Sequence, residues 1–238
     1  MATSPHGESM HLLLVEDRGQ RAAVVARYEH PYLVRLTHWL SAISVTVMIL
    51  SGLQIFRAFP SFGPKIPQAD LVKVPASLGL GGWLGGALQW HLTFMWPLIA
   101  AGVTYLVYQA ASGNYRQVLF SRTDISGVWP MVRYYFLFGP KPESKQSYNP
   151  LQKLAYTSTI LYGVVAAISG LALYKPVQFS PLLWILGGYR IARIWHFVAM
   201  LGFVSFIPGH LMMVAFHGWG NFYSMLVGWR TDKMSSGS

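Results

Sequence analysis

Four long stretches of the chain carry no Asp, Glu, Lys or Arg, and the charged residues gather between them. These stretches are residues 36–55, 83–109, 154–174 and 194–216. A helix needs about 20 mostly apolar residues to cross the roughly 30 Å hydrocarbon core of a bilayer. Each stretch is therefore predicted to form one transmembrane helix. The predicted fold class is an all-α membrane protein with a four-transmembrane-helix bundle.

The segments between these spans carry their own signals. Residues 128–138 are aromatic and amphipathic, which predicts a helix lying along the inner membrane interface. Asn149 is predicted to cap the third span, with Pro150 at its first helical position. Residues 175–190 are apolar but too short to cross, so we expect them to rest on the membrane surface and to form part of a docking face.

The composition supports a membrane protein and excludes several kinds of cysteine-dependent site. Of the 238 residues, 53% are hydrophobic and only 11% are charged, against about 25% charged in an average soluble domain. The sequence contains no cysteine. Disulfides, cysteine-bound zinc, iron–sulfur clusters and covalently attached haem are therefore excluded, because each requires cysteine.

The distribution of positive charge predicts the orientation of the chain. Twelve Lys and Arg residues fall on the side of the two termini, and six fall on the opposite side. The positive-inside rule then predicts that both termini are cytoplasmic. This topology accounts for the net charge of +10, so membrane lipid and not nucleic acid is the expected partner of the basic residues.

Three segments are expected along the chain. Residues 1–29 are predicted to be an N-terminal cytoplasmic extension, either a partly ordered tail or a short surface helix, and their charges do not fit a signal peptide. Residues 30–230 would form the four-helix domain, whose first span also serves as an uncleaved targeting signal. Residues 231–238 would be a C-terminal tail.

Four of the eight histidines fall within or at the margins of the spans: His38 in the first, His91 in the second, His196 and His210 in the fourth. Fourteen residues of helix place His196 and His210 within about 40° on one face and roughly 21 Å apart along the axis. The predicted topology puts His38 at the depth of His210, and His91 nearer the depth of His196. The histidines are thus sorted into two pairs at two depths.

Two imidazoles from facing helices in an apolar bundle suit haem b, whose iron accepts a histidine on each face. Two such pairs predict two haems that carry electrons and have no open position for oxygen chemistry. A single histidine could instead be structural, hydrogen bonded to a hydroxyl or a carbonyl group; four paired histidines without other ionisable residues favour the cofactor. Arg35 and Arg193 each lie three residues before a proposed ligand. Each could pair with a haem propionate or could simply anchor a helix end.

His217 is the second candidate on the fourth span for the inner pair. It lies seven residues after His210 and only about 20° around the helix from it, so depth must decide. His217 would lie roughly 31 Å from His196, about the full hydrocarbon thickness, and is followed by "GWGN". We therefore predict that His210 pairs with His38 and that His217 is an interfacial residue.

Several motifs of the sequence resemble those of a known family. "HPYLVRLTHWLSAISVTVMILSGLQIF", the span around His91, "YNPLQKLAY" and "RIWHFVAMLGFVSFIPGH" resemble di-haem cytochrome b subunits of membrane-bound hydrogenases, formate dehydrogenases and thiosulfate reductases. The thiosulfate-reductase-like branch is the most similar, and the resemblance covers about residues 29–230. It implies haem ligands at His38, His91, His196 and His210.

The resemblance also implies a function: anchoring a periplasmic catalytic or electron-carrying redox subunit in the bacterial inner membrane and exchanging electrons with quinone. A molybdenum enzyme is the first expected partner and a nickel–iron hydrogenase the second. Quinone is expected near the inner haem, with Arg35, His30 and Tyr32 as polar candidates. The alternatives are a histidine-using metal transporter, although the spans contain no carboxylate, and a haem-based membrane sensor.

Overall fold

The structure is a computed structural model that describes residues 2–3, 9–17, 20–60, 62, 73–140, 142 and 148–233. Side chains are described from residue 26 onward within these ranges, except at residue 217 and residues 231–233. The chain forms two compact units. Leu40–Ile207 is one unit, and Met1–Trp39 with Pro208–Ser238 is the other. Each unit is described by itself below.

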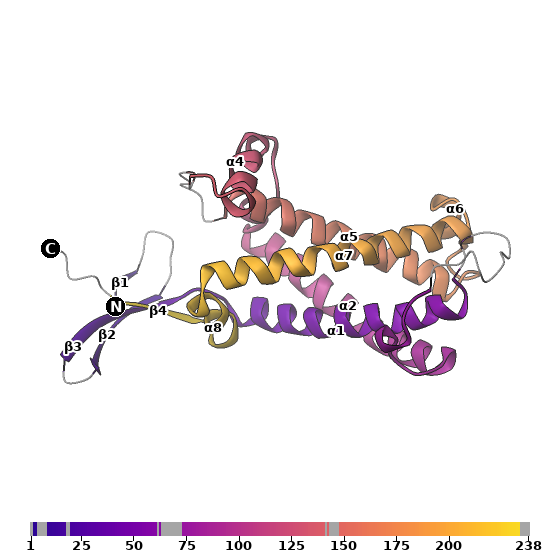
Figure 1. The fold of residues 1–238 in the computed structure, drawn as a ribbon, viewed down its shortest axis with the longest axis horizontal. Helices are drawn as coiled ribbons and strands as arrows, with labels where there is room; N and C mark the ends of the chain where they lie inside the picture. The colour runs from indigo at the N-terminus through magenta and orange to yellow at the C-terminus, as the bar shows by residue number, and fades with distance from the viewer. Residues whose placement is uncertain are drawn as a thin grey trace. The chain divides into compact units, whose positions relative to one another are not determined.

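Four long helices dominate the chain: α1 (Tyr32–Ala58), α2 (Leu84–Ser112), α5 (Pro150–Tyr174) and α7 (Tyr189–His217) (Figure 1). All four are long and apolar enough to cross a membrane. They contain or closely match the four predicted spans, so the predicted helical membrane fold is confirmed. Helices α1 and α7 each continue from one unit into the other.

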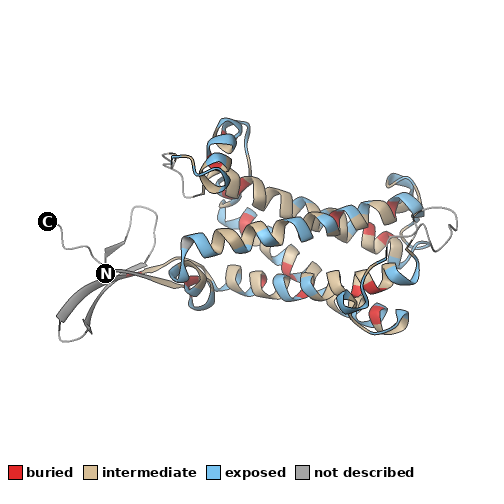
Figure 2. Ribbon diagram, viewed as in Figure 1, coloured by how far each residue is buried: buried red, intermediate tan, exposed pale blue. Residues whose placement is uncertain are grey.

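The surface of these helices is apolar, and most of their buried positions are small residues. Figure 2 shows few buried residues along the long helices, and those within Leu40–Ile207 include Ala87, Ala101, Ala172 and Ala199. Large apolar side chains such as Val107, Leu161 and Trp195 are exposed instead. Small residues at helix contacts with large apolar residues facing outward are typical of helices packed within lipid.

The described parts of the segments between the long helices contain short helices. Figure 1 labels α4 and α6 among them. They are η2 (Ala76–Leu78), α3 (Tyr115–Val118), η3 (Arg122–Asp124), α4 (Ile125–Phe136) and α6 (Ser180–Ile185). Helix α4 lies where the amphipathic interface helix is predicted, and Trp129 and Phe136 on it are exposed. Helix α6 adds a short helical turn to the apolar segment that the sequence predicts as a surface loop.

Helix α5 begins as the sequence predicts. The Asn149 side chain accepts a hydrogen bond from the Gln152 backbone N–H (2.9 Å), and the Gln152 side chain accepts one from the Asn149 backbone N–H (3.0 Å). Pro150 is the first helical residue, where a missing N–H costs nothing. One turn into α5, the buried Lys153 ammonium forms an ion pair with buried Asp124 at 3.2 Å.

The unit formed by the chain ends contains α8 (Trp219–Val227) and a four-stranded antiparallel sheet. Its strands are β1 (Ala2–Thr3), β2 (Ser9–Asp17), β3 (Gln20–Tyr28) and β4 (Trp229–Lys233), in the order β1-β2-β3-β4. The prediction of a partly ordered tail or a surface helix is therefore wrong. The extension pairs with the C-terminal segment, for example Tyr28 with Trp229, a contact between residues too distant in sequence for local patterns to reveal. Most side chains of residues 1–29 and 231–238 lie outside the described residues.

The Asp124–Lys153 pair leads to a stability prediction. Replacing Lys153 with Met leaves the Asp124 carboxylate buried without its cation, which is more costly than losing both charges together. We expect the Lys153→Met variant to melt several degrees lower than the parent in detergent. The double variant Asp124→Asn, Lys153→Met should recover part of that loss. Equal melting temperatures for the parent and the single variant would show that the pair contributes little.

Candidate functional site

The four span histidines lie in two close pairs, each within one unit of the chain. His91 on α2 faces His196 on α7, with ring centroids 6.0 Å apart and ring planes at 67°. His38 on α1 faces His210 on α7, again with centroids 6.0 Å apart and planes at 54°. The structure thus brings together the same two pairs that the depth argument predicts.

This separation fits two imidazoles that share one metal ion. A metal–imidazole bond is roughly 2 Å long, and a ring nitrogen lies about 1 Å from its ring centroid, so two axial imidazoles have centroids roughly 6 Å apart. Among the described residues, no group of three or more His, Cys, Asp or Glu side chains could hold a metal by itself. Each pair therefore suits a metal whose remaining ligands belong to a cofactor.

The proton of the His196 ring is placed by its neighbours on α5. Its Nδ1 atom lies 3.1 Å from the Ala166 carbonyl oxygen and 3.1 Å from the Ser169 hydroxyl. A carbonyl oxygen can only accept a hydrogen bond, so Nδ1 must carry the hydrogen and donate it. The other nitrogen, Nε2, then has a free lone pair, the form in which neutral histidine binds a metal.

His91 has an equivalent neighbour on α1. Its Nδ1 atom lies 3.0 Å from the Ser51 hydroxyl oxygen. That hydroxyl donates its own hydrogen to the Val47 carbonyl oxygen at 2.7 Å, so it accepts from His91 Nδ1. The Nε2 atom of His91 is therefore also left with a free lone pair that could bind a metal. Both hydroxyl groups, of Ser51 and Ser169, belong to residues that are fully buried.

The His38–His210 pair has different surroundings. Trp39 stands edge-on to the His38 ring, and its indole N–H donates to the Met225 carbonyl oxygen at 3.1 Å. One turn earlier, the Arg35 guanidinium donates to the Leu226 carbonyl oxygen at 2.7 Å. Both acceptors are in the last turn of α8, so the first turns of α1 are fixed to that helix. The Nε atom of Arg35 is buried and has no hydrogen-bond partner among the described residues.

Arg193 has contacts that fix one end of the unit formed by Leu40–Ile207. Its guanidinium donates to the Phe59 carbonyl oxygen at 3.0 Å. It also lies 4.9 Å from the centre of the Phe59 ring and 5.6 Å from that of Phe62. These contacts join the start of α7 to the segment that follows α1, which is the anchoring role considered for this residue.

The glycines near the histidines have different roles. A Cβ atom at Gly52 would lie 3.4 Å from Cε1 of His91, so this glycine borders the imidazole. Cβ atoms at Gly85, Gly86 and Gly202 would instead meet Trp83, the Gly81 carbonyl and Tyr162, respectively. They allow close packing of the protein itself.

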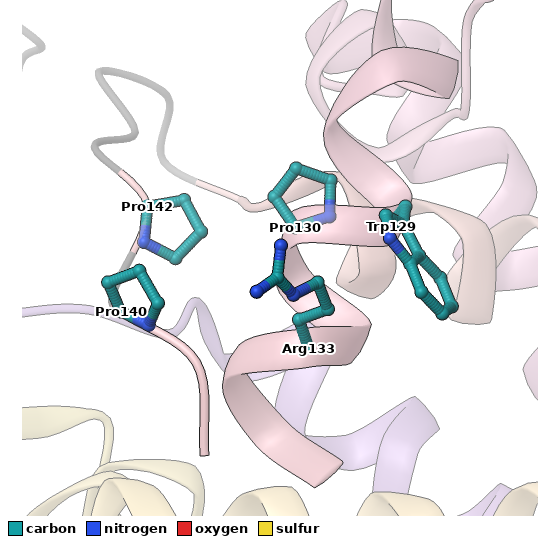
Figure 3. A pocket seen from close by; sticks show the side chains of 5 residues that line it. All are labelled: Trp129, Pro130, Arg133, Pro140 and Pro142. Atoms are coloured by element: carbon teal, nitrogen blue, oxygen red, sulfur yellow. The ribbon is translucent and has the colours of Figure 1, made fainter. Parts of the chain in front are cut away.

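A pocket of the Leu40–Ile207 unit is lined by residues of α4 and of the segment that follows it. Its lining residues are Trp129, Pro130, Arg133, Pro140 and Pro142 (Figure 3). None of these side chains is a ligand for iron. The pocket is therefore not a candidate for the cofactor site.

Paired histidines on membrane-spanning helices, with Nε2 free in the His91–His196 pair, define a membrane cytochrome of the b type, in which haem is held without cysteine. The comparison with protein families agrees: residues 29–228 match the family described as prokaryotic cytochrome b561. The chain belongs to this family, and the membership predicted from its motifs is confirmed. Members of this family bind haem b and serve as membrane subunits of oxidoreductases.

Curated relatives point to two kinds of complex. A protein of Azospira oryzae named YedZ1, assigned as a subunit of protein-methionine-sulfoxide reductase, is 39% identical over 187 residues, covering 78% of this chain and 89% of the relative. A B-type cytochrome subunit assigned to Ni/Fe-hydrogenase 1 of Escherichia coli K12 is 25% identical over 207 residues, covering 80% and 83%. A similar hydrogenase subunit of Cupriavidus necator is 24% identical over 205 residues, covering 79% of each chain.

Sequence reasoning did not identify Ser51 and Ser169. A signal for them was present, because the tripeptide Ser-Gly-Leu occurs twice in the chain, at Ser51–Leu53 and at Ser169–Leu171. Both copies lie inside predicted spans, where a serine next to a glycine is also an ordinary helix-packing pair. Only the folded structure shows that each copy faces a histidine.

Proposed function

We infer that this chain anchors a redox partner in the membrane and passes electrons between that partner and quinone through two haem b groups. The observation that carries this proposal is the pair of histidine contacts, His38–His210 and His91–His196, each with ring centroids 6.0 Å apart. These four residues are the proposed axial ligands. Haem bound there would supply reversible one-electron chemistry, and with both axial positions filled it would offer no site for oxygen.

The protein's own part in this function is to hold and orient. Ser51 keeps the hydrogen of the His91 ring on Nδ1, and Ser169 keeps that of the His196 ring on Nδ1. The buried Nε–H of Arg35, which has no partner among the described residues, is a donor suited to a haem propionate. Arg193 retains further N–H groups for the same purpose, although its described contacts are with Phe59 and Phe62.

The proposed orientation places both termini in the cytoplasm of a bacterium and the chain in its inner membrane. It rests on the twelve-to-six distribution of Lys and Arg. On the opposite, periplasmic side, α6 and the turn before it present Val177, Trp184 and Ile185, which are 81%, 84% and 70% exposed. This apolar surface is the proposed docking site of the partner, nearest the His91–His196 pair.

The partner is proposed to be a reductase subunit. The 39% identity to YedZ1 exceeds the 22–25% identity to the hydrogenase cytochromes, which favours a reductase over a hydrogenase. A molybdenum enzyme remains the first candidate and a nickel–iron hydrogenase the second. Co-purification in mild detergent distinguishes them by the metal that accompanies the chain.

Quinone is proposed to exchange electrons near the His38–His210 pair. His30, Tyr32 and Arg35 gather where the sheet meets the start of α1, and the His30 backbone N–H donates to the Gly228 carbonyl oxygen at 3.3 Å. Burial lowers the pKa of His30; Glu29 raises it, and Arg35 lowers it further. The neutral imidazole that results is able to accept a proton from a quinol.

The two alternative functions have less support. A transporter for a divalent metal would usually combine imidazoles with carboxylates, and the four spans contain neither Asp nor Glu. A haem-based sensor needs an open axial position, whereas each pair here offers an imidazole to both sides. Carbon monoxide binding to the reduced protein would favour the sensor.

The assignment of His210 over His217 gives a direct prediction. Helix α7 ends at His217, and His210 is the residue that faces His38. The His210→Ala variant should lose one of two haems and keep the other, as judged by reduced-minus-oxidised spectra and haem content. The matched variant His217→Ala should keep both. An exchange of these two outcomes would refute the inner pairing.

The quinone proposal predicts a kinetic effect without a spectral one. Replacing His30 with Ala or Tyr32 with Phe should slow the reduction of the haems by added quinol at least several-fold, because proton transfer or binding is impaired. Both haem spectra should remain unchanged. Tyr189→Phe, at the start of α7, serves as the control. Loss of a haem in either variant would instead assign these residues a structural role.

A further inference from the structure

The two copies of Ser-Gly-Leu lie on different helices, yet each is placed against one histidine of the same pair. The Ser51 hydroxyl of α1 hydrogen bonds with His91, and a Cβ added at Gly52 would meet the same ring; Ser169 and Gly170 of α5 have the same relation to His196. No other part of the sequence repeats this tripeptide. Each serine hydroxyl lies against Nδ1 of the ring, and the ring atom nearest to a Cβ added at each glycine would be Cε1.

Each serine hydroxyl accepts a hydrogen bond from its histidine and does not donate one to it. The Ser51 hydroxyl donates to the Val47 carbonyl oxygen and the Ser169 hydroxyl donates to the Val165 carbonyl oxygen, at 2.7 Å and 2.5 Å. Each hydroxyl hydrogen is thus engaged four residues back along its own helix. The oxygen lone pair that remains accepts the Nδ1–H of the facing imidazole, at 3.0 Å and 3.1 Å.

Each glycine lets the ring lie close to the helix backbone. A Cβ atom at Gly170 would lie 3.1 Å from Cε1 of His196, and one at Gly52 would lie 3.4 Å from Cε1 of His91. Cε1 is the ring carbon between the two nitrogens, so displacing it would turn Nε2 as well. Among the described glycines, these two are the ones whose added Cβ would have a histidine ring as its nearest neighbour.

The His38–His210 pair has no such copy beside it. Gly209, next to His210, has open space around an added Cβ. Thr37, next to His38, donates its hydroxyl hydrogen to the Leu33 carbonyl oxygen of its own helix at 2.8 Å. Both Ser-Gly-Leu copies therefore lie beside the ligands of one of the two haem sites proposed above.

We propose that the two Ser-Gly-Leu segments are positioning elements that lower the midpoint potential of the His91–His196 haem. This inference rests on the proposed function, since it assumes that both histidines bind one haem. A hydrogen bond accepted from Nδ1–H raises the electron density at Nε2 and strengthens its bond to the metal. A stronger donor stabilises ferric over ferrous iron. Both ligands of this one haem would donate Nδ1–H to a serine, so the effects of the two serines add, although His196 also donates to the Ala166 carbonyl oxygen.

The test is a redox titration of membranes containing the full chain, followed by the visible absorbance of each haem. Ser51→Ala and Ser169→Ala should each raise the midpoint potential of the same haem, the double variant should raise it further, and the other haem should not move. Ser44→Ala is the matched control. Ser44 is on the same face of α1, seven residues before Ser51, equally buried, and has no hydrogen-bond partner among the described residues.

Haem retention is a second readout, because removing such a supporting group typically weakens metal binding roughly 10–100-fold. If the two serine variants lose the same haem that His196→Ala loses and keep the other haem, the proposal is supported. Unchanged potentials and full retention in both serine variants would overturn it, as would equal shifts in both haems. A parent chain that holds fewer than two haems would instead overturn the proposed function.

The glycines provide a test that does not depend on the serines. Gly170→Ala should change the low-spin ferric EPR signal of one haem, because the His196 ring must rotate to admit the methyl group. Gly209→Ala, beside His210 but with open space at its Cβ, should leave both signals unchanged. Identical spectra for Gly170→Ala and the parent would contradict the positioning role.

Discussion

The candidate site between α2 and α7 depends on the placement of one hydrogen on each of its two imidazoles, those of His91 and His196, within helices that carry no Asp or Glu. An N–H group buried in an apolar setting without an acceptor costs about 1–3 kcal/mol, and a misplaced hydrogen on Nε2 would block metal binding. Between His91 and His196 this is solved by acceptors on the neighbouring helices. The Ala166 carbonyl and the Ser169 hydroxyl serve His196, and the Ser51 hydroxyl serves His91. Helices α1 and α5 thus leave the lone pairs of His91 Nε2 on α2 and His196 Nε2 on α7 available.

The other pair is held by the ends of the chain. His38 is on the first turns of α1, which Arg35 and Trp39 attach to the last carbonyl groups of α8. The Glu29 backbone N–H donates to the Gly228 carbonyl oxygen at 2.9 Å, and Gly228 itself has a positive φ of 93°. A side chain at Gly228 would lie 3.2 Å from the Arg35 guanidinium carbon. The turn between α8 and β4 therefore requires glycine, and the sheet continues directly from this junction.

Much of the fold could be predicted because its strongest determinants are local. Charge-free length identified the four spans, and Asn149 with Pro150 marked the start of α5. The two histidine pairs followed from helix geometry along one span and from topology. The sheet was missed because β3 pairs with β4 across the whole length of the chain, which no local pattern encodes. Ser51 and Ser169 were missed for a related reason, because their role depends on a histidine of another helix and not on the sequence of their own helices.

We propose that the two histidine pairs hold two haems, and every other role suggested for this chain builds on that stoichiometry. The most direct measurement is the ratio of haem to protein in the purified chain, with haem quantified as its pyridine haemochrome and protein by amino-acid analysis. The account predicts two haem b per chain, all extractable into acidified solvent because the chain contains no cysteine. A ratio of one haem per chain in fully loaded protein would contradict it.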